Sequence, residues 1–164
     1  MRGRRGVASL DRMADRPTPP DPDFAARVRA SFAQQAFMTT LGASLELVRP
    51  GEVHVALPFA PALTQQHGFL HAGATAAIAD SANGYAALTL TPAGYEVLAV
   101  EFKINLLAPG RAPRFVAEAR VIRSGRTLTV CSCEVIAEAD GERTTIALMQ
   151  GTMMSVRGRE SVAD

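Results

Sequence analysis

The order of apolar and polar residues along the chain predicts a helix, a hairpin, a longer helix and then four strands. Between residues 23 and 35, apolar residues recur near helical spacing, and Asp21 or Asp23 is a candidate N-cap. Two short stretches of alternating apolar and polar residues follow, joined by Pro50-Gly51, whose order fits a type II turn. We therefore expect these two stretches to form a β-hairpin.

The second half of the pattern begins with an alanine-rich stretch at residues 71–90, a composition that favours helix and lets other backbones approach closely. Beyond residue 94 the period becomes two, which predicts four strands up to residue 156. Asp140-Gly141 is a strong two-residue hairpin signal between the last two strands. In the first of the four strands, one face is expected to be apolar, made of Leu98, Val100, Phe102, Ile104 and Leu106.

One long helix among five to six mostly antiparallel strands is an α+β arrangement. The apolar face of the sheet needs cover, and the helix at residues 71–90 is the only long candidate, so the sheet should wrap around it. Residues 1–22 are polar and rich in proline, which predicts a disordered tail, and the sequence leaves open whether Met13 is the true start. We expect one domain at residues 23–156 and a short C-terminal tail at 157–164.

The composition argues against a nucleic-acid-binding protein and a membrane protein. The 164 residues carry a formal net charge of +1, which argues against broad nucleic-acid binding because that requires a basic surface. No apolar run approaches the ~18 residues of a membrane-spanning helix, and no secretory signal is visible, so we expect a cytoplasmic protein without a membrane partner. Cys131 and Cys133 are two residues apart in a predicted strand, and we interpret them as reduced core residues.

The candidate chemistry lies between residues 65 and 84. Gly68 and Gly73 permit tight backbone geometry at the start of the long helix, where unpaired N–H groups can polarise a carbonyl oxygen. Asp80 follows among apolar neighbours, and a carboxylate is costly to bury there without a partner. We therefore expect Asp80 to line a polar cavity and to act as a general base or a nucleophile.

Spacing along the helix places these two features apart. Nine residues separate His71 from Asp80, which corresponds to about 900° of rotation and roughly 13.5 Å of rise. The helix start and the carboxylate therefore point to opposite sides of the helix. If both serve one site, a second chain must supply one of them, which predicts a symmetric dimer with two equivalent sites at its interface.

The motif Gln65-x-x-Gly68-x-x-His71-Ala72-Gly73, followed by Asp80, resembles the signature of hotdog-fold acyl-CoA thioesterases. The similarity is strongest to the group that contains the phenylacetate-degradation thioesterase and 4-hydroxybenzoyl-CoA thioesterase. It implies a hotdog fold and hydrolysis of acyl-CoA, with coenzyme A as part of the substrate and no separate cofactor. It also implies homodimers whose sheets pair edge to edge, and it leaves open whether two dimers form a tetramer.

The resemblance assigns roles by position. Asp80 matches the carboxylate that attacks the thioester or activates water, and the N–H of Ala72 would polarise the thioester carbonyl. Gln65 would hold the water or the substrate carbonyl. Together with His71 and Gly73 at the helix entrance, these residues form the expected catalytic group. The alternative for His71 is a structural role in capping or packing, and Gly68 is expected to contact the substrate.

The sequence departs from the family pattern at two positions. Some members carry a hydroxyl residue one turn after the carboxylate, where this chain has Gly84, and others carry a serine at the position of Ala99. Asn83 is the candidate that remains for holding the water. For the phosphates of coenzyme A the resemblance indicates a turn between two strands, comprising Arg123, Gly125, Arg126 and Thr127; the alternative is that these are ordinary surface charges at a hairpin end.

Other kinds of site have less support. His67 and His71 have no third ligand at a metal spacing, so no metal site is expected. The alternatives to a thioesterase are a hotdog enoyl-CoA hydratase or dehydratase, and a non-catalytic acyl-CoA binding protein, since fold alone does not decide function. The acyl group is not determined by the sequence, although Phe37, Phe59, Phe69 and Tyr85 are candidates to shape its pocket.

Overall fold

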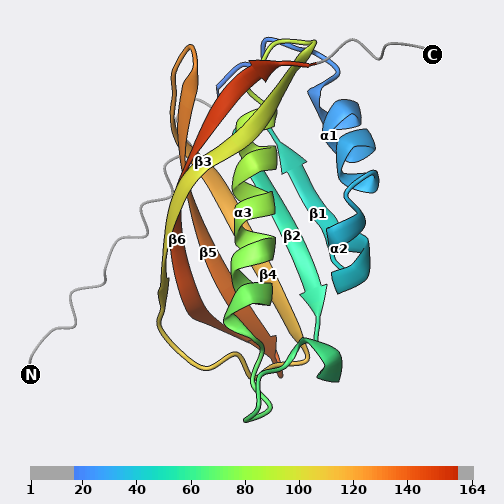
Figure 1. Ribbon diagram of the computed structural model, residues 1–164, viewed down its shortest axis with the longest axis vertical. Coiled ribbons are helices and arrows are strands. Elements are labelled where there is room, and N and C mark those ends of the chain that lie inside the picture. The colour runs from blue at the N-terminus through green and yellow to red at the C-terminus, as the bar shows by residue number, and fades with distance from the viewer. Residues whose placement is uncertain (1–16, 159–164) are drawn as a thin grey trace, which may run out of the picture.

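In the computed structural model, which describes residues 17–158, one antiparallel sheet curves around one long helix (Figure 1). The six strands are ordered β1-β2-β4-β5-β6-β3, so β1 and β3 are the edges of the sheet. The long helix is α3, Ala72–Leu88, which confirms the predicted α+β architecture. The strands are β1 Ser44–Arg49, β2 Glu52–Pro58, β3 Tyr95–Leu106, β4 Arg114–Ser124, β5 Leu128–Ala139 and β6 Glu142–Arg157.

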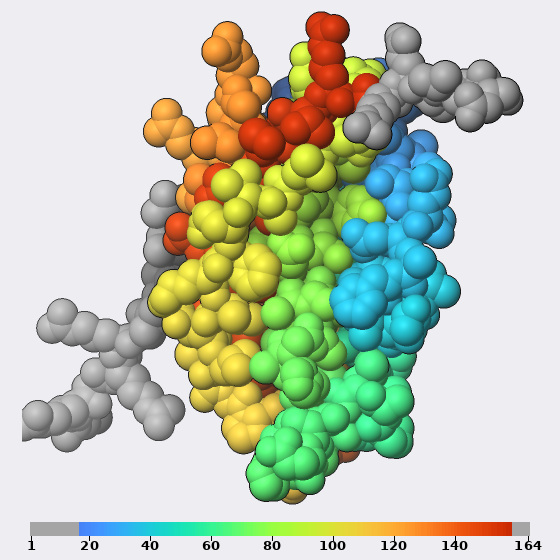
Figure 2. All heavy atoms as spheres, viewed as in Figure 1, coloured from blue at the N-terminus to red at the C-terminus, as the bar shows by residue number. Residues whose placement is uncertain are grey.

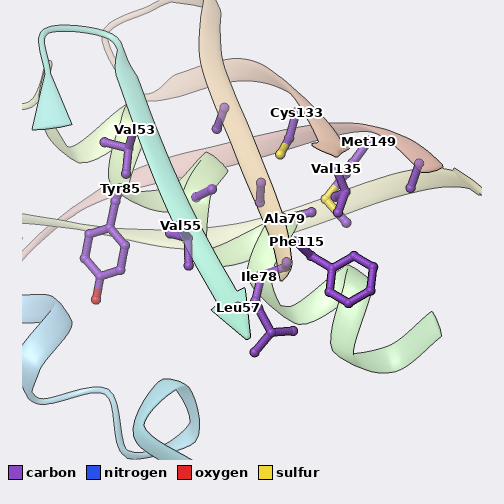
Figure 3. Close-up of a cluster of buried hydrophobic side chains, with 14 of the residues drawn as sticks. Val53, Val55, Leu57, Ile78, Ala79, Tyr85, Phe115, Cys133, Val135 and Met149 are labelled. Carbon is purple, nitrogen blue, oxygen red and sulfur yellow. The ribbon is translucent and has the colours of Figure 1, made fainter. Parts of the chain in front are cut away.

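The hydrophobic core lies between α3 and the concave face of the sheet (Figure 3). Small residues of α3, among them Ala79, Ala82 and Ala86, are fully buried, which lets the helix lie close to the strands. Alternate residues of each strand meet the helix because successive side chains of a strand point to opposite faces. Burial of each large aliphatic side chain contributes about 1.5–3 kcal/mol. The core therefore fixes the position of α3, on which the candidate carboxylate lies.

Two shorter helices flank α3 on the side of β1: α1, Phe24–Ala33, and α2, Ala36–Leu41 (Figure 1). Helix α1 confirms the prediction for residues 23–35, whereas α2 was not predicted because six residues are too few to show a helical period. Helix α2 ends at Gly42, whose φ of 73° is left-handed and favours glycine. A 3-10 turn, Pro61–Leu63, follows β2.

The start of α1 has the expected N-cap residue but differs from expectation in where the packed chain begins. Asp23 occupies the N-cap position, but within the described residues its side chain makes no capping hydrogen bond. Instead, Asp21 Oδ1 accepts a hydrogen bond from the Asp23 N–H at 2.9 Å, and Asp21 Oδ2 lies 3.2 Å from Arg27 Nε. Asp21 is buried, so the packed structure begins before residue 23. Residues 1–16 of the expected tail, Met13 included, and residues 159–164 lie outside the described part of the chain.

The expected apolar face of β3 is interrupted. The register of β3 against β6 shifts between Ala99 and Glu101, which is a β-bulge. Leu98 pairs with Met154 whereas Ile104 pairs with Met149, so Leu98 and Ile104 lie on opposite faces of the sheet. The prediction of one continuous apolar face was therefore wrong, because a bulge adds a residue without a partner and reverses the alternation.

The predicted turns are confirmed by their backbone angles. Gly51 has a φ of 72°, as the second central residue of a type II turn requires, and Asp140 and Gly141 have φ values of 52° and 80°. Cys131 and Cys133 are buried free thiols on one face of β5, as expected. Within residues 17–158, no helix is long and apolar enough to span a membrane.

Candidate active site

The loop before α3 folds back on itself. The N–H of Gln65 donates to the carbonyl of Phe69 at 2.9 Å, and the N–H of Gly68 donates to the carbonyl of Gln65 at 2.9 Å. Gly68 has a φ of 80°, a conformation that side chains other than glycine rarely adopt. The motif glycine at position 68 therefore closes the loop and brings Gln65 to the start of the helix.

His71 is the N-cap of α3. Its Nδ1 accepts a hydrogen bond from the backbone N–H of Gly73 at 2.8 Å, so the ring satisfies one of the unpaired amides of the first turn. A Cβ atom at Gly73 would lie 3.0 Å from that Nδ1, closer than ordinary packing allows. The structure therefore places His71 and Gly73 together as a capping pair, and this accounts for the glycine.

Ala72 is the first residue of α3, and its N–H has no carbonyl one turn earlier in the helix to accept from it. Ala72 and Gln65 line one cavity of about 360 Å³, together with Phe69, Thr75 and Ile146. Within the described chain, the carboxamide oxygen of Gln65 accepts from the N–H of His67, which holds the Gln65 side chain in its own loop. The structure thus brings Gln65 and Ala72 together at the positive end of the helix dipole.

Asp80 lies in a second cavity, of about 340 Å³, between α1, α3 and β3. Figure 2 shows α3 lying between β3 on one side and α1 and α2 on the other. Burial raises the pKa of the Asp80 carboxyl above its usual value, because removal from water disfavours the charged form. Within residues 17–158, Asp80 Oδ1 is buried and has no hydrogen-bond partner.

The two positions where the sequence departs from the family pattern, Gly84 and Ala99, both line the Asp80 cavity. Neither provides a hydroxyl group beside the carboxylate. Asn83 is fully buried, and within the described residues neither of its amide atoms has a partner. The cavity therefore contains a carboxylate of raised pKa. The two positions at which some family members carry a hydroxyl residue are Gly84 and Ala99 in this chain.

Sequence reasoning missed the contribution of α1 to this cavity. Ser31 of α1 and Gln35, the N-cap of α2, reach α3: the Ser81 hydroxyl donates to the amide oxygen of Gln35 at 3.2 Å, and the hydroxyls of Ser31 and Tyr85 are 3.5 Å apart. In Figure 3 the ring of Tyr85 points toward the short helices. These pairs are 46 and 54 residues apart in sequence, so no local pattern could reveal them.

Of the four aromatic residues expected to shape the acyl pocket, two line a cavity and two are exposed. Tyr85 lines the Asp80 cavity and Phe69 lines the Gln65 cavity, where the guanidinium of Arg111 lies 4.9 Å from the centre of the Phe69 ring. By contrast, Phe37 and Phe59 are exposed, with 58% and 37% of their surface accessible. Only Tyr85 and Phe69 are therefore placed to shape either cavity in the single chain.

The two cavities share no lining residue. Gln65 and Ala72 lie at the start of α3, and Asp80 opens onto another side of the helix more than two turns later. A single chain therefore does not bring the carboxylate and the helix N-terminus to one reacting group, which agrees with the spacing argument.

The turn that contains Arg123, Gly125, Arg126 and Thr127 joins β4 and β5 at the end of the molecule opposite the start of α3 (Figure 1). All four residues are exposed, and the N–H of Gly125 donates to the carbonyl of Leu128 at 2.9 Å. Within one chain this turn lies far from Gln65 and Ala72. Among residues 17–158, no group of three or more His, Cys, Asp or Glu side chains could hold a metal ion.

Comparison with known proteins gives consistent results. Residues 67–144 match the family model of the thioesterase superfamily. A protein of Saccharolobus solfataricus described as "Putative esterase" is 31% identical over 134 residues, which cover 82% of this chain and 87% of that protein. A protein of Halobacterium salinarum with the same description is 28% identical and covers 82% of this chain and 94% of its own length.

Solved structures agree on the fold. A thioesterase family protein from Silicibacter pomeroyi is 48% identical, with a TM-score of 0.81, covering 82% of this chain and 99% of that protein. The E. coli PaaI protein from the phenylacetic acid degradation operon has a TM-score of 0.76 at 23% identity, covering 85% of this chain and 97% of its own. At that identity the PaaI likeness shows the fold alone. Together these structures confirm the expected hotdog fold.

Proposed function

The chain belongs to the thioesterase superfamily, which indicates hydrolysis of a thioester or ester bond, and from this premise we propose that it hydrolyses acyl thioesters of coenzyme A. The observation that supports the proposal is that one chain carries a half-buried carboxylate, Asp80, in one cavity and a helix N-terminus, at Ala72, in another. A free amide can polarise the acyl carbonyl, and a carboxylate can act on the acyl carbon as a base or a nucleophile. Coenzyme A enters as part of the substrate.

The amide of Ala72 polarises the acyl carbonyl. As the first N–H of α3 it points out of the helix, and the helix dipole adds partial positive charge at the same end. A donor aimed at the carbonyl oxygen stabilises the negative charge that develops there, which in other enzymes contributes about 100- to 1,000-fold in turnover. Gln65, in the same cavity, orients the reacting groups.

Asp80 supplies the carboxylate chemistry. As a base it takes a proton from water while the water oxygen bonds to the acyl carbon; as a nucleophile its own oxygen forms that bond, and water then releases the acid. In both cases the carbon–sulfur bond breaks and coenzyme A leaves as a thiolate. A raised pKa suits the first case, because a base works best with a pKa near the working pH.

A homodimer assembles these parts. β3 is an edge strand with exposed apolar side chains, including Val100 at 54% and Phe102 at 45%, and such an edge favours pairing with another strand. When β3 of one protomer pairs with β3 of the other about a two-fold axis, the two strands run antiparallel. The Asp80 cavity of one protomer then approaches the Ala72 end of the other. The Arg123–Thr127 turn of the same protomer as Asp80 approaches as well, where it can bind phosphate.

The first test measures release of free thiol from short, long and aromatic acyl-CoAs. Replacing Asp80 with Asn should reduce turnover by about 100-fold or more, as expected for loss of a base, with the fold intact. The matched control is Asp23→Asn. Asp23 is the exposed N-cap residue before α1, and it lines neither cavity. Near wild-type turnover by the Asp80→Asn protein would refute the assignment.

A second variant isolates the amide. Ala72→Pro removes only the N–H, because proline is well tolerated at the first helical position and His71, at φ −65° and ψ 137°, already has the conformation preferred before proline. Ala72→Ser keeps the N–H and is the control. Turnover should fall in the proline variant and remain in the serine variant.

Mixing the two inactive variants tests the shared site. When Asp80→Asn and Ala72→Pro protomers exchange, each mixed dimer has one site with both defects and one intact site. Equal mixing should therefore restore about a quarter of wild-type activity, as two-fold symmetry requires. Sites contained within one protomer would show no recovery.

The absence of a hydroxyl at Gly84 and Ala99 favours one alternative, an acyl-CoA binding protein without turnover. Tight binding of acyl-CoA with no thiol release, unchanged by Asp80→Asn, would establish it. Hydration of an enoyl-CoA without thioester cleavage would instead identify a hydratase.

A further inference from the structure

Arg111 lies in the connection between β3 and β4, which runs past the loop before α3 (Figure 1). The N–H of Leu70 in that loop donates to the carbonyl of Gly110 at 2.9 Å. A Cβ atom at Gly110 would lie only 2.8 Å from the Cβ of Leu70, so glycine is what permits the close approach. The backbone next to Arg111 is therefore fixed against the loop that contains the motif.

The guanidinium of Arg111 is held over an aromatic ring and keeps its hydrogen-bond donors free. It lies 4.9 Å from the centre of the Phe69 ring, a distance at which a cation is attracted to the face of the ring. Within the described part of the chain Arg111 makes no ion pair. By contrast, three arginines that line other hollows each pair with a glutamate: Arg114, Arg120 and Arg143. Arg111 is thus positioned and available to bind an anion.

The cavity beside Arg111 is electropositive. No acidic side chain of the described chain lines the Gln65 cavity, and the N-terminus of α3 adds partial positive charge at Ala72. Arg111 itself lines the neighbouring hollow, of about 350 Å³, which shares Pro109 and Ile146 with the Gln65 cavity. The guanidinium therefore lies beyond the far wall of the cavity as seen from the helix start.

The acidic groups near the two cavities favour the same assignment. The Asp80 cavity contains the carboxylates of Asp80 and Glu96, and no cation of the described chain lines it. Asp140 and Glu142 border the hollow of Arg111, but both are exposed to solvent, where salt screens their charge, and neither pairs with the guanidinium among the described residues. An anionic group of a substrate is therefore better accommodated beside Arg111 than in the Asp80 cavity.

We propose that Arg111 binds a carboxylate at the distal end of the acyl group, so that the preferred substrates are coenzyme A thioesters of dicarboxylic acids. The inference rests on the proposed function. The acyl carbonyl lies at the Ala72 amide, and coenzyme A extends toward the Arg123–Thr127 turn of the protomer that supplies Asp80. The acyl group then extends the other way, along the apolar walls of the Gln65 cavity. At its end, the planar guanidinium binds a carboxylate through two parallel hydrogen bonds.

The test uses pairs of substrates that differ only in a terminal carboxylate or methyl group: glutaryl-CoA with pentanoyl-CoA, and adipyl-CoA with hexanoyl-CoA. In the full-length protein, kcat and KM for thiol release are measured for wild type, Arg111→Gln and Arg111→Lys. Rates without enzyme are subtracted, because a terminal carboxylate can attack its own thioester. The matched control is Arg29→Gln, since Arg29 is exposed on α1 and lines neither cavity.

Wild type should prefer the carboxylate member of each pair. In Arg111→Gln the ratio of kcat/KM between the two members should fall about tenfold, the lower end of the range for a hydrogen-bonded charge because the arginine is exposed. Activity on the methyl-terminated substrates should not change, and Arg29→Gln should behave as wild type. Arg111→Lys should keep only part of the preference, because an ammonium lacks the planar fork. Added salt should weaken the preference of wild type.

A variant of the ring tests how the guanidinium is positioned. Phe69→Leu keeps an apolar wall in the Gln65 cavity but removes the face on which Arg111 lies. It should reduce the preference for the carboxylate substrates, by less than Arg111→Gln does, because the charge remains but is no longer held. A Phe69→Leu protein with the full preference would show that the ring does not position Arg111.

Two results would overturn the inference. One is a ratio of kcat/KM that is the same in wild type and Arg111→Gln. The other is an equal loss on both members of each pair; if that loss disappears with N-acetylcysteamine thioesters, which lack phosphates, Arg111 binds the phosphates of coenzyme A instead. If wild type releases no thiol from any acyl-CoA, the proposed function fails, whereas turnover that depends on Asp80 but not on a terminal carboxylate rejects this inference alone. Calorimetric Kd values for non-hydrolysable thioethers of the same pairs test Arg111 independently of turnover.

Discussion

Arg27 joins helix α1 to the end of α3. Its Nη2 donates to the carbonyls of Leu88 at 3.0 Å and Thr91 at 2.8 Å, and its Nη1 donates to the carbonyls of Pro92 at 2.7 Å and Tyr95 at 3.3 Å. The last carbonyls of a helix have no partner within the helix. One guanidinium therefore caps the C-terminus of α3 and holds the start of β3 to it.

Replacing Arg27 with Ala removes one donor from each of these carbonyls and the ion pair from the buried carboxylate of Asp21. The Leu88 and Pro92 carbonyls keep a second donor, from Thr91 and Tyr95 respectively. Hydrogen bonds to charged groups are worth about 1.5–3 kcal/mol each when buried, but this side chain is 19% exposed and water can replace some contacts, so we expect a total loss of about 3 kcal/mol. For a domain of this size that corresponds to a fall in Tm of about 6–12 °C.

Thermal unfolding followed by circular dichroism measures the effect. The matched control is Arg29→Ala, an exposed arginine on the same helix, which should change Tm by less than about 2 °C, as surface substitutions usually do. If Arg27→Ala and Arg29→Ala unfold at the same temperature, the capping argument is wrong.

Three further predictions follow from single features. Because burial raises the pKa of Asp80, the folded state binds more protons than the unfolded state between the ordinary and the raised pKa, so wild-type stability falls as pH rises through that range; Asp80→Asn should lack this fall and match or exceed wild-type Tm at neutral pH, and a lower Tm there would contradict it. Phe102→Lys on the exposed edge of β3 should shift the protein to monomers in sedimentation and abolish turnover, whereas Ile122→Lys, 65% exposed on β4, should do neither. Burial raises the pKa of the Cys131 thiol to about 12, so neither it nor Cys133 should react with a disulfide reagent at pH 8 until the protein unfolds, and rapid labelling of the native protein would show exposure.

Local patterns in the sequence were sufficient for most elements of the fold. The alanine-rich stretch predicted at residues 71–90 is α3 at Ala72–Leu88, and the turns at Gly51 and Asp140-Gly141 have the backbone angles that their residues favour. These features depend on residues that are neighbours in sequence, so the amino-acid sequence alone was sufficient to predict them. The separation of Asp80 from the start of its helix followed in the same way from helical geometry.

The tertiary structure alone decided which residues surround the carboxylate. Ser31 and Gln35 reach α3 across 54 and 46 residues, the bulge in β3 turns Leu98 away from the face of Ile104, and Asn83 loses its contact with water beneath Gly151. Each of these depends on how distant segments pack, and periodicity reports only which face of one element is apolar. The sequence by itself therefore determined the elements and the motif, whereas burial, register and the composition of the two cavities were decided by packing between segments far apart along the chain.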